Sequence, residues 1–295
     1  MARTRFRSDK GLTLRMGGVG LGLGALYVAF GAFLIYYTGF AFGLIIVLAM
    51  SWGQWYFSDT LALKSMGARE VTPEQAPELH AMIDRLCALA DMKKPRVAVA
   101  VTDMPNAFAT GRSPNHSSVC VTTGILQRLD ADELEGVLSH ELAHVANRDV
   151  TVMTVASSLG LLAGFITRWG MYAFGGRNNK NGLGFVAVFA VSMIVYFVSF
   201  ILTRSLSRYR ELSADRSGAY LTGRPSKLSS ALVKISGEMA RIPNSDLREG
   251  QAISAFFIAP AINRESIGAL FSTHPPLQQR LDQLAKVSAE LSEPL

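Results

Sequence analysis

The chain has 295 residues, of which 49% are apolar and only 18% are charged, against about 25% charged residues in ordinary globular proteins. This composition excludes a disordered or strongly solvated chain and favours one that contacts lipid. The net charge of +6 does not indicate a nucleic-acid site, because most of it lies in the basic residues before Met16 and the remainder is almost neutral. We therefore expect no nucleic-acid partner.

The first long apolar stretch runs from Met16 to Ser58 and contains no charged residue. Because one membrane-spanning helix needs about 20 apolar residues, residues 16–58 predict a membrane hairpin of two spans, after a basic tail over residues 1–15. We place its turn near Tyr36–Gly39, where an aromatic pair and a glycine suit the membrane interface. The alternative is a buried helical hairpin of a soluble protein. A cleaved signal peptide would have a shorter apolar region.

The segment after this hairpin predicts alternating helices and strands. Residues 74–91 carry apolar side chains at helical spacing and predict an amphipathic helix that ends before Pro95. Val97–Val101 and Ser118–Thr122 predict short strands that could pair across the loop containing Asn115. A further helix begins at Asp130, where the pattern of a capping box indicates a helix start.

A second pair of apolar segments, Val150–Gly164 and Leu183–Thr203, is separated by a polar, glycine-rich stretch. We predict a second membrane hairpin over residues 150–203; deep burial against the first hairpin is the competing interpretation. The basic tail favours a cytoplasmic N-terminus, which places residues 59–149 and 204–295 in the cytoplasm as well. The only two cysteines, Cys87 and Cys120, form no C-x-x-C pair, and we predict reduced thiols.

The segment His140-Glu141-Leu142-Ala143-His144 lies on the helix predicted after Asp130. Histidines four residues apart on a helix emerge from one face, so both imidazoles can bind the same metal ion. Glu141 lies beside them, where it can take a proton from an attacking water. We predict one Zn²⁺ ion per chain; two imidazoles with one carboxylate suit zinc, although the pattern does not exclude another divalent ion.

A third protein ligand is expected on a second helix, which we predict over about residues 204–221. It carries Glu211 and Asp215 four residues apart, hence on one face. We assign Glu211 as the third metal ligand and Asp215 as the acceptor for the ring N–H of a ligand histidine. Ala214 and Gly218 would let a partner helix approach closely. The alternative is an exposed face of ion pairs with Arg208, Arg210 and Arg216.

Four motifs occur in order along the chain: Asn106–Gly111, His140–Asp149, Arg210–Asp215 and Phe271–Leu277. With them the chain resembles, over nearly its whole length, the HtpX-type membrane zinc metalloproteases, which are related to the CAAX prenyl proteases. The resemblance implies a zinc metalloendopeptidase of the cell membrane that acts in stress response and membrane-protein quality control. The longer basic tail departs from this family pattern.

The expected fold is mainly α with a small β-sheet (α+β). It is a multi-pass membrane protein with a zincin-like catalytic domain built around the HExxH helix. Because the histidine helix runs into the third apolar segment and the fourth runs into the Glu211 helix, the ligands should meet at the cytoplasmic ends of the spans. We therefore expect the lipid bilayer as a partner and membrane proteins or unfolded polypeptides as substrates. The sequence predicts no oligomeric state.

The remaining candidate residues have less specific patterns. A segment that a substrate peptide could join as an added strand, or that forms a plain turn, begins with Asn106, Ala107, Phe108 and Ala109. His274 precedes two prolines in an extended stretch; it is a candidate to stabilise the oxyanion or caps the next helix. Arg280 is a further candidate for oxyanion support. His80 and His116 are interpreted as structural or solvated.

In the predicted mechanism, Glu141 removes a proton from the attacking water and then delivers a proton to the leaving amine. One alternative is a catalytically silent membrane scaffold that keeps a zinc site for folding; the presence of Glu141 argues against it. Another is a zinc carrier or channel, which would need polar residues along the spans, where the sequence has almost none.

Overall fold

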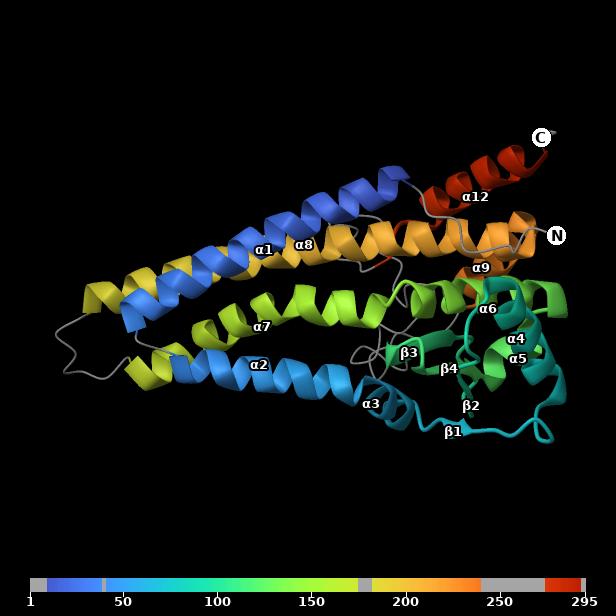
Figure 1. The fold of residues 1–295 in the computed structure, drawn as a ribbon, viewed down its shortest axis with the longest axis horizontal. Coiled ribbons are helices and arrows are strands. Elements are labelled where there is room, and N and C mark those ends of the chain that lie inside the picture. Colours follow the sequence, from blue (N-terminus) through green and yellow to red (C-terminus); the bar gives the residue numbers. More distant parts are fainter. Residues whose placement is uncertain (1–9, 39–40, 175–181, 240–273, 293–295) are drawn as a thin grey trace.

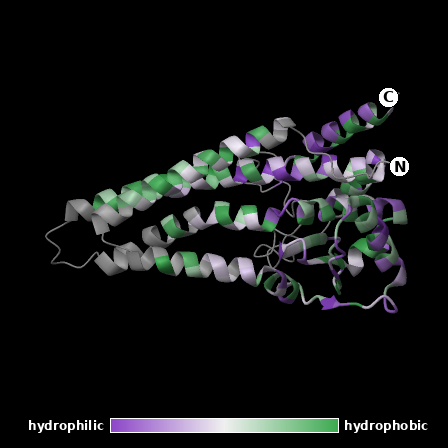
Figure 2. Ribbon diagram, viewed as in Figure 1, coloured by the Kyte–Doolittle hydropathy of each residue, from purple (hydrophilic) through white to green (hydrophobic). Residues whose placement is uncertain are grey.

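The structure, a computed structural model, describes residues 10–38, 41–174, 182–239 and 274–292 of the chain. A bundle of long helices extends to one side, and a part that contains a small sheet lies at the other end (Figure 1). The apolar residues are concentrated along the bundle and the polar ones at the sheet end (Figure 2). The fold is therefore mostly helical with a small mixed sheet, as predicted.

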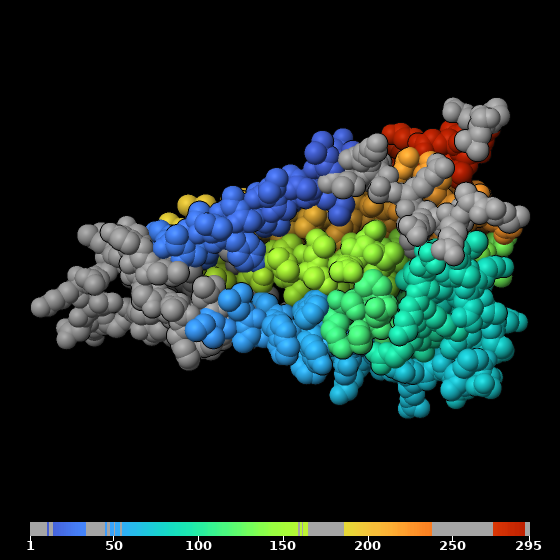
Figure 3. Space-filling view, in the orientation of Figure 1, coloured from blue at the N-terminus to red at the C-terminus, as the bar shows by residue number. Residues whose placement is uncertain are grey.

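The bundle consists of four helices that lie side by side: α1 (Lys10–Thr38), α2 (Ala41–Tyr56), α7 (Asp149–Phe174) and α8 (Gly182–Thr222). On the face shown in Figure 3, α7 lies between α1 and α2. Helix α1 continues through the residues predicted as a turn up to Thr38, and Gly39 lies outside the described residues. The glycine-rich stretch predicted between the later spans, residues 175–182, also lies outside them except for Gly182.

Two helical segments among the described residues, Leu14–Phe33 and Val186–Thr222, are long and apolar enough to cross a membrane. Their apolar side chains point outward to a large extent, with Leu21 exposed to 78% and Ile194 to 63%. Such exposure is unfavourable in water and favourable in lipid. The spans predicted in α2 and α7 stay predictions.

The helix predicted separately over residues 204–221 is in fact the last part of α8, which runs for 41 residues without a break. The stretch from Leu202 to Arg210 contains neither proline nor glycine, so nothing in it interrupts the hydrogen-bond ladder. The apolar segment and the segment that carries Glu211 therefore form one continuous helix.

The sheet has four strands in the order β1-β2-β4-β3: β1 (Arg69–Glu70), β2 (Arg96–Ala100), β3 (Ala107–Ser113) and β4 (His116–Thr122). The two strands predicted from the sequence, β2 and β4, do pair, but in parallel. The loop containing Asn115 joins β4 to β3 instead, an antiparallel hairpin. The expected pairing across that loop was wrong because it missed β3, which lies at the edge of the sheet.

Shorter helices surround the sheet and the central helix α6 (Ala131–Ala146): α3 (Ser58–Ser65), α4 (Pro77–Ala90), α5 (Thr123–Arg128), α9 (Pro225–Met239) and α12 (Leu277–Ser292). The predicted capping box at the start of α6 is confirmed. The Glu133 amide donates to Asp130 Oδ1 at 2.8 Å, and the Asp130 amide donates to Glu133 Oε2 at 3.0 Å. Because Leu138 and Leu142 are fully buried, α6 lies within the core.

Cys87 and Cys120 are both free and buried, which confirms the prediction of thiols rather than a disulfide. Burial raises the pKa of Cys87 to about 11 and that of Cys120 to about 12. Both groups are therefore protonated at neutral pH, and neither has the lowered pKa of a reactive cysteine.

Helices α6 and α8 approach each other closely at Gly218. A Cβ atom at this position would lie 2.9 Å from the backbone nitrogen of His140 and 2.9 Å from Ser139 Oγ. Ser139 Oγ also donates a hydrogen bond to the Gly218 carbonyl at 3.2 Å. This contact sets the spacing between the helix with the two histidines and the helix with Glu211, as the predicted close approach requires.

We expect Gly218→Ala to destabilise the protein by about 1–3 kcal/mol, since the added methyl group would clash with backbone atoms of His140, which cannot move away by a side-chain rotation. The measurement is thermal unfolding in detergent, with Gly237→Ala as the matched control. Gly237 lies in α9 with nothing within 4 Å of an added Cβ, so alanine there should be neutral or mildly stabilising. An unchanged melting temperature of Gly218→Ala would contradict the assigned contact.

Candidate metal centre

The side chains of His140, His144 and Glu211 meet between α6 and α8. The two Nε2 atoms of the histidines lie 3.1 Å apart. The Glu211 carboxylate faces both, with Oε2 3.6 Å from His140 Nε2 and Oε1 3.4 Å from His144 Nε2. Among the described residues, these three form the group of histidine, cysteine and acidic side chains whose ligand atoms lie close enough together to hold a metal ion.

The second ring nitrogen of each histidine faces a buried carboxylate. His140 Nδ1 lies 2.9 Å from Asp215 Oδ1, and His144 Nδ1 lies 2.5 Å from Asp149 Oδ2. A carboxylate at Nδ1 holds the proton there and leaves the Nε2 lone pair for a metal. Two such nitrogens and one carboxylate oxygen are a donor set that suits zinc. The residues present therefore fit a divalent ion.

Each of these carboxylates also contacts an arginine. Arg280 donates from Nε and Nη2 to Asp215, at 2.7 and 2.6 Å. Arg210 Nε lies 3.0 Å from Asp149 Oδ1. Arg280 is a candidate for oxyanion support; its guanidinium lies on Asp215 and is only 2% exposed, a placement that suits positioning of Asp215.

His274, the other candidate for oxyanion stabilisation, lies beside the candidate ligands. Its Nδ1 is 3.0 Å from Glu211 Oε2, and its side chain is buried. The structure thus brings His274 to the metal group from the segment before α12, on the Glu211 side. Its alternative role, as a cap of the following helix, stays a prediction.

Glu141 lies between the candidate ligands and the edge strand β3. Its Oε2 accepts a hydrogen bond from the Ala109 backbone N–H at 2.9 Å, and the side chain is only 4% exposed. Burial raises the pKa of the Glu141 carboxyl above its ordinary value. A carboxyl whose pKa is raised in this way is suited to taking up and returning a proton.

The remaining carboxylates of the site are held in their charged form. Burial alone would raise the pKa of Glu211, Asp149 and Asp215. The neighbouring side chains, His274 at Glu211, Arg210 at Asp149 and Arg280 at Asp215, outweigh it and lower these pKa values. Burial lowers the pKa of His144, but hydrogen bonds to Asp149 and Glu211 more than offset it and raise the pKa to about 10. The cluster therefore favours positive charge at the histidine pair, where a metal cation is expected.

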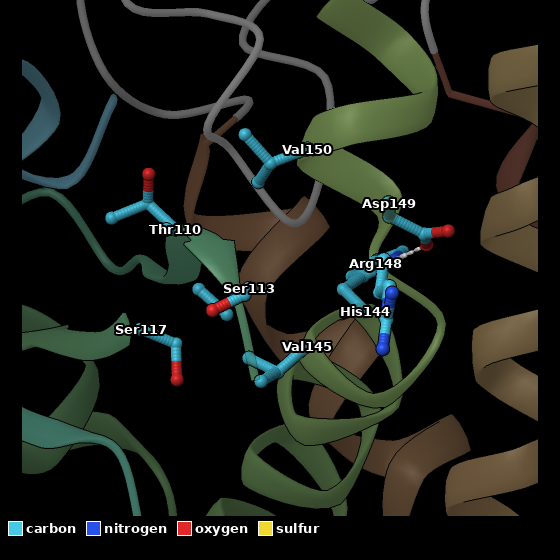
Figure 4. Close-up of a pocket in the computed structure, with 10 residues that line it drawn as sticks. Thr110, Ser113, Ser117, His144, Val145, Arg148, Asp149 and Val150 are labelled. Atoms are coloured by element: carbon cyan, nitrogen blue, oxygen red, sulfur yellow. Dashed lines mark hydrogen bonds and ion pairs between the residues drawn. The ribbon is translucent and has the colours of Figure 1, made fainter. Parts of the chain in front are cut away.

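A small pocket opens beside His144, between strand β3 and the junction of α6 and α7. Figure 4 shows Thr110 and Ser113 on one side of it and His144, Arg148 and Asp149 on the other. The pocket reaches Ala109, the residue that bonds Glu141. The edge strand β3 thus borders both the candidate base Glu141 and the pocket beside His144, an arrangement that could take an added peptide strand.

The residues predicted to bind substrate occupy the start of this edge strand. Ala107 and Phe108 are buried in β3, Asn106 is buried directly before it, and Ala109 is partly exposed. Because three of these side chains point into the protein, a peptide would meet the main chain of the strand rather than their side chains. The extended conformation agrees with one of the two predicted alternatives, the strand rather than the plain turn.

Two residues of the site were missed by the reasoning from the sequence, Asp149 and Arg210. Asp149 closes the motif that begins at His140, and Arg210 was considered as a partner in an exposed face of ion pairs. The available signals were weak: Asp149 follows His144 by five residues, beyond a helix break, and Arg210 directly precedes Glu211. The other two histidines lie apart from the metal group: His80 contacts Val71, and His116 contacts Ser113.

Comparison with known proteins adds independent information. The sequence profile of Peptidase family M48 matches residues 73–288. Protease HtpX homolog 1 of Streptomyces coelicolor is 54% identical over 99% of this chain and 97% of the relative. Protease HtpX homolog of Moorella thermoacetica is 52% identical over 99% of both chains. Protease HtpX homolog 2 of Methanosarcina mazei is 47% identical over 98% of this chain and 100% of the relative.

The fold also resembles a solved structure, the crystal structure of S. mikatae Ste24p. The TM-score is 0.55, and the alignment covers 94% of this chain and 67% of that chain. The sequence identity is 17%, so this likeness concerns the fold alone.

Proposed function

Because the chain belongs to peptidase family M48 and is a metallopeptidase of the HtpX type, we propose that it is a zinc-dependent endopeptidase. Its proposed substrates are misfolded or damaged membrane proteins, cut at the cytoplasmic face of the cell membrane. The observation that carries the proposal is the Glu141 carboxylate, held by the Ala109 N–H beside the histidine pair of a helix that leads directly into the helical bundle.

We propose that His140, His144 and Glu211 hold one zinc ion per chain. When bound there, the ion supplies Lewis-acid chemistry to the scissile carbonyl and to the attacking water. Asp215 and Asp149 keep the protons of the two imidazoles on Nδ1, and Arg280 holds Asp215 in place. The binding of a single divalent ion follows from three convergent donors of suitable type.

The protein side chains supply the proton transfers. A carboxylate oxygen of Glu141 takes a proton from the attacking water and then returns a proton to the leaving amine. The hydrogen bond from Ala109 orients this carboxylate, while the outer edge of strand β3, which begins after Asn106, takes the substrate as an added strand. His274 is our candidate for stabilising the oxyanion, because it reaches the same group from the Glu211 side.

We further propose that all four bundle helices cross the bilayer, with residues 59–149 and 204–295 in the cytoplasm. Helix α6 is separated from α7 by only two residues, and Glu211 stands on α8 itself. The candidate ligands therefore lie where the bundle ends, which favours substrates that are in the membrane or emerge from it. The arginines Arg204 and Arg208, which follow the apolar part of α8, suit the cytoplasmic interface.

The experiment that tests the proposal places the purified, zinc-loaded chain in vesicles together with a destabilised membrane protein. A soluble unfolded protein is tested as a substrate in parallel, and the Glu141→Gln variant serves as the negative control. We expect cleavage of the membrane protein in its loops on the side where the basic tail of the enzyme is accessible. Efficient cleavage of the soluble protein with none of the reconstituted one would overturn the proposed substrate class.

A further inference from the structure

We propose that Arg210 and Asp149 form a positioning pair for His144, through which helices α7 and α8 set the affinity of the metal site. Arg210 fixes the Asp149 carboxylate, and this carboxylate fixes the His144 ring. The inference rests on the proposed zinc site and adds to it two residues that touch no metal. It concerns how the ligands are held, and it ties the metal site to two helices of the bundle.

The first support is the geometry of Asp149, which is the first residue of α7 and is only 1% exposed. One carboxylate oxygen lies 2.5 Å from His144 Nδ1, and the other lies 3.0 Å from Arg210 Nε. One oxygen thus has a hydrogen-bond partner and the other an ion-pair partner, and the two contacts together orient the carboxylate. A buried carboxylate needs such partners to remain charged, and a charged one is the stronger acceptor for the ring N–H.

The second support is the turn that brings Asp149 back to the ring. Helix α6 ends at Ala146, and Arg148 has a φ of 56°, in the left-handed region that residues other than glycine rarely adopt. The turn is closed by backbone hydrogen bonds from Asn147 to Ala143 and from Arg148 to Val145. A left-handed residue of this kind commonly ends a helix; here it lets the chain turn so that Asp149, the first residue of α7, faces the His144 ring.

The third support is the position of Arg210 directly before Glu211 on α8. Two consecutive residues of this helix thus have different roles. Arg210 positions the candidate ligand His144 through Asp149, and Glu211 is a candidate ligand itself. The Arg210 side chain is only 10% exposed, and α7 packs along α8 in the bundle (Figure 1). A shift of either helix would therefore move Arg210 and Asp149 relative to each other and turn the His144 ring.

The other candidate histidine ligand, His140, has a comparable arrangement of a carboxylate and an arginine. His140 faces Asp215, and Asp215 is held by Arg280 of α12. Both rings thus have a carboxylate at Nδ1 and a guanidinium behind the carboxylate. The two chains of contacts share helices α6 and α8 but no residue, so each can be disrupted without removing a residue of the other.

The test measures the zinc dissociation constant of the full-length chain in detergent by competition with a chromophoric chelator. Asp149→Asn keeps the size and shape of the side chain. Its amide can, however, donate a hydrogen bond to His144 Nδ1 and so leave the ring proton on Nε2, the atom proposed to bind the metal. We expect zinc binding about 10- to 100-fold weaker. The absorption bands of the Co²⁺-loaded chain should also shift. Arg210→Met should weaken binding similarly, while Arg210→Lys should restore most of it.

The matched control is Arg216→Met, which changes another arginine of α8 and removes its ion pair with Glu290 of α12. The zinc affinity should stay within about twofold of the parent value, since ion pairs near the surface contribute little. Melting temperatures are recorded for every variant. Parent-like affinity and Co²⁺ spectra in Asp149→Asn and Arg210→Met would overturn the inference, as would an equal loss in the control. A parent chain that takes up no zinc would instead overturn the proposed function.

Discussion

The Glu141→Gln variant is expected to bind zinc as the parent does and to hydrolyse peptide bonds about 100- to 10,000-fold more slowly, the range that general acid–base catalysis contributes. Glutamine has nearly the shape of glutamate and can still accept the Ala109 N–H bond. Its amide oxygen cannot take up a proton at neutral pH, so the proton of the attacking water has no acceptor at this position. The measurement is initial-rate cleavage of an unfolded protein, beside the zinc content of the same sample.

The matched control for this variant is Glu135→Gln, which changes the same chemical group on the same helix. Glu135 lies outside the metal group and pairs with Arg85 at 2.8 Å, so its loss should leave the cleavage rate close to that of the parent. If zinc-loaded Glu141→Gln cut as fast as the parent, Glu141 would not be the base. The proton would then have to leave by another group.

The second large effect is expected for Glu211→Ala, which should be isolated without stoichiometric zinc and without peptidase activity. The substitution removes one of three candidate ligands and leaves two imidazoles whose Nε2 atoms face each other at 3.1 Å. The loss of affinity should exceed the about 10- to 100-fold that removal of an outer partner causes. Elemental analysis of the purified chain measures the zinc, and cleavage of an unfolded protein measures the activity.

A carboxylate on the C-terminal helix provides the control for Glu211→Ala. Glu290→Ala removes a group that pairs with Arg216 of α8 near the surface, and we expect one zinc per chain and parent-like cleavage. Together with Glu141→Gln, the three variants separate metal binding from proton transfer. One zinc per chain in Glu211→Ala, bound as tightly as in the parent, would contradict the assignment of Glu211 as a ligand.

Much of the local structure could be predicted because it depends on near neighbours in the sequence. The capping box at Asp130 is a contact between residues three apart, and the two histidines share a helix face because they are four apart. The strands β2 and β4 were also located. Their parallel pairing and strand β3 were not, because register and partner depend on chain segments that sequence periodicity does not connect.

The continuity of α8 was missed for a different reason. The change from apolar to charged residues near Arg204 was interpreted as the start of a new helix, but it marks a change of surroundings along one helix. Helix ends follow from capping groups and breakers rather than from hydropathy. In a chain that meets both lipid and water, a change in hydropathy is therefore a poor indicator of a helix boundary.

By itself, the sequence predicted two groups of candidate residues, each on one helix face: His140, Glu141 and His144 by their spacing, and Glu211 with Asp215 by theirs. Only the tertiary structure decided how they are held. Arg280 meets Asp215 across 65 positions of the chain, and His274 meets Glu211 across 63. The periodicity of a helix sets which residues share a face within a few turns. The partners of a buried carboxylate depend on which helices pack against each other, and this follows from the fold as a whole.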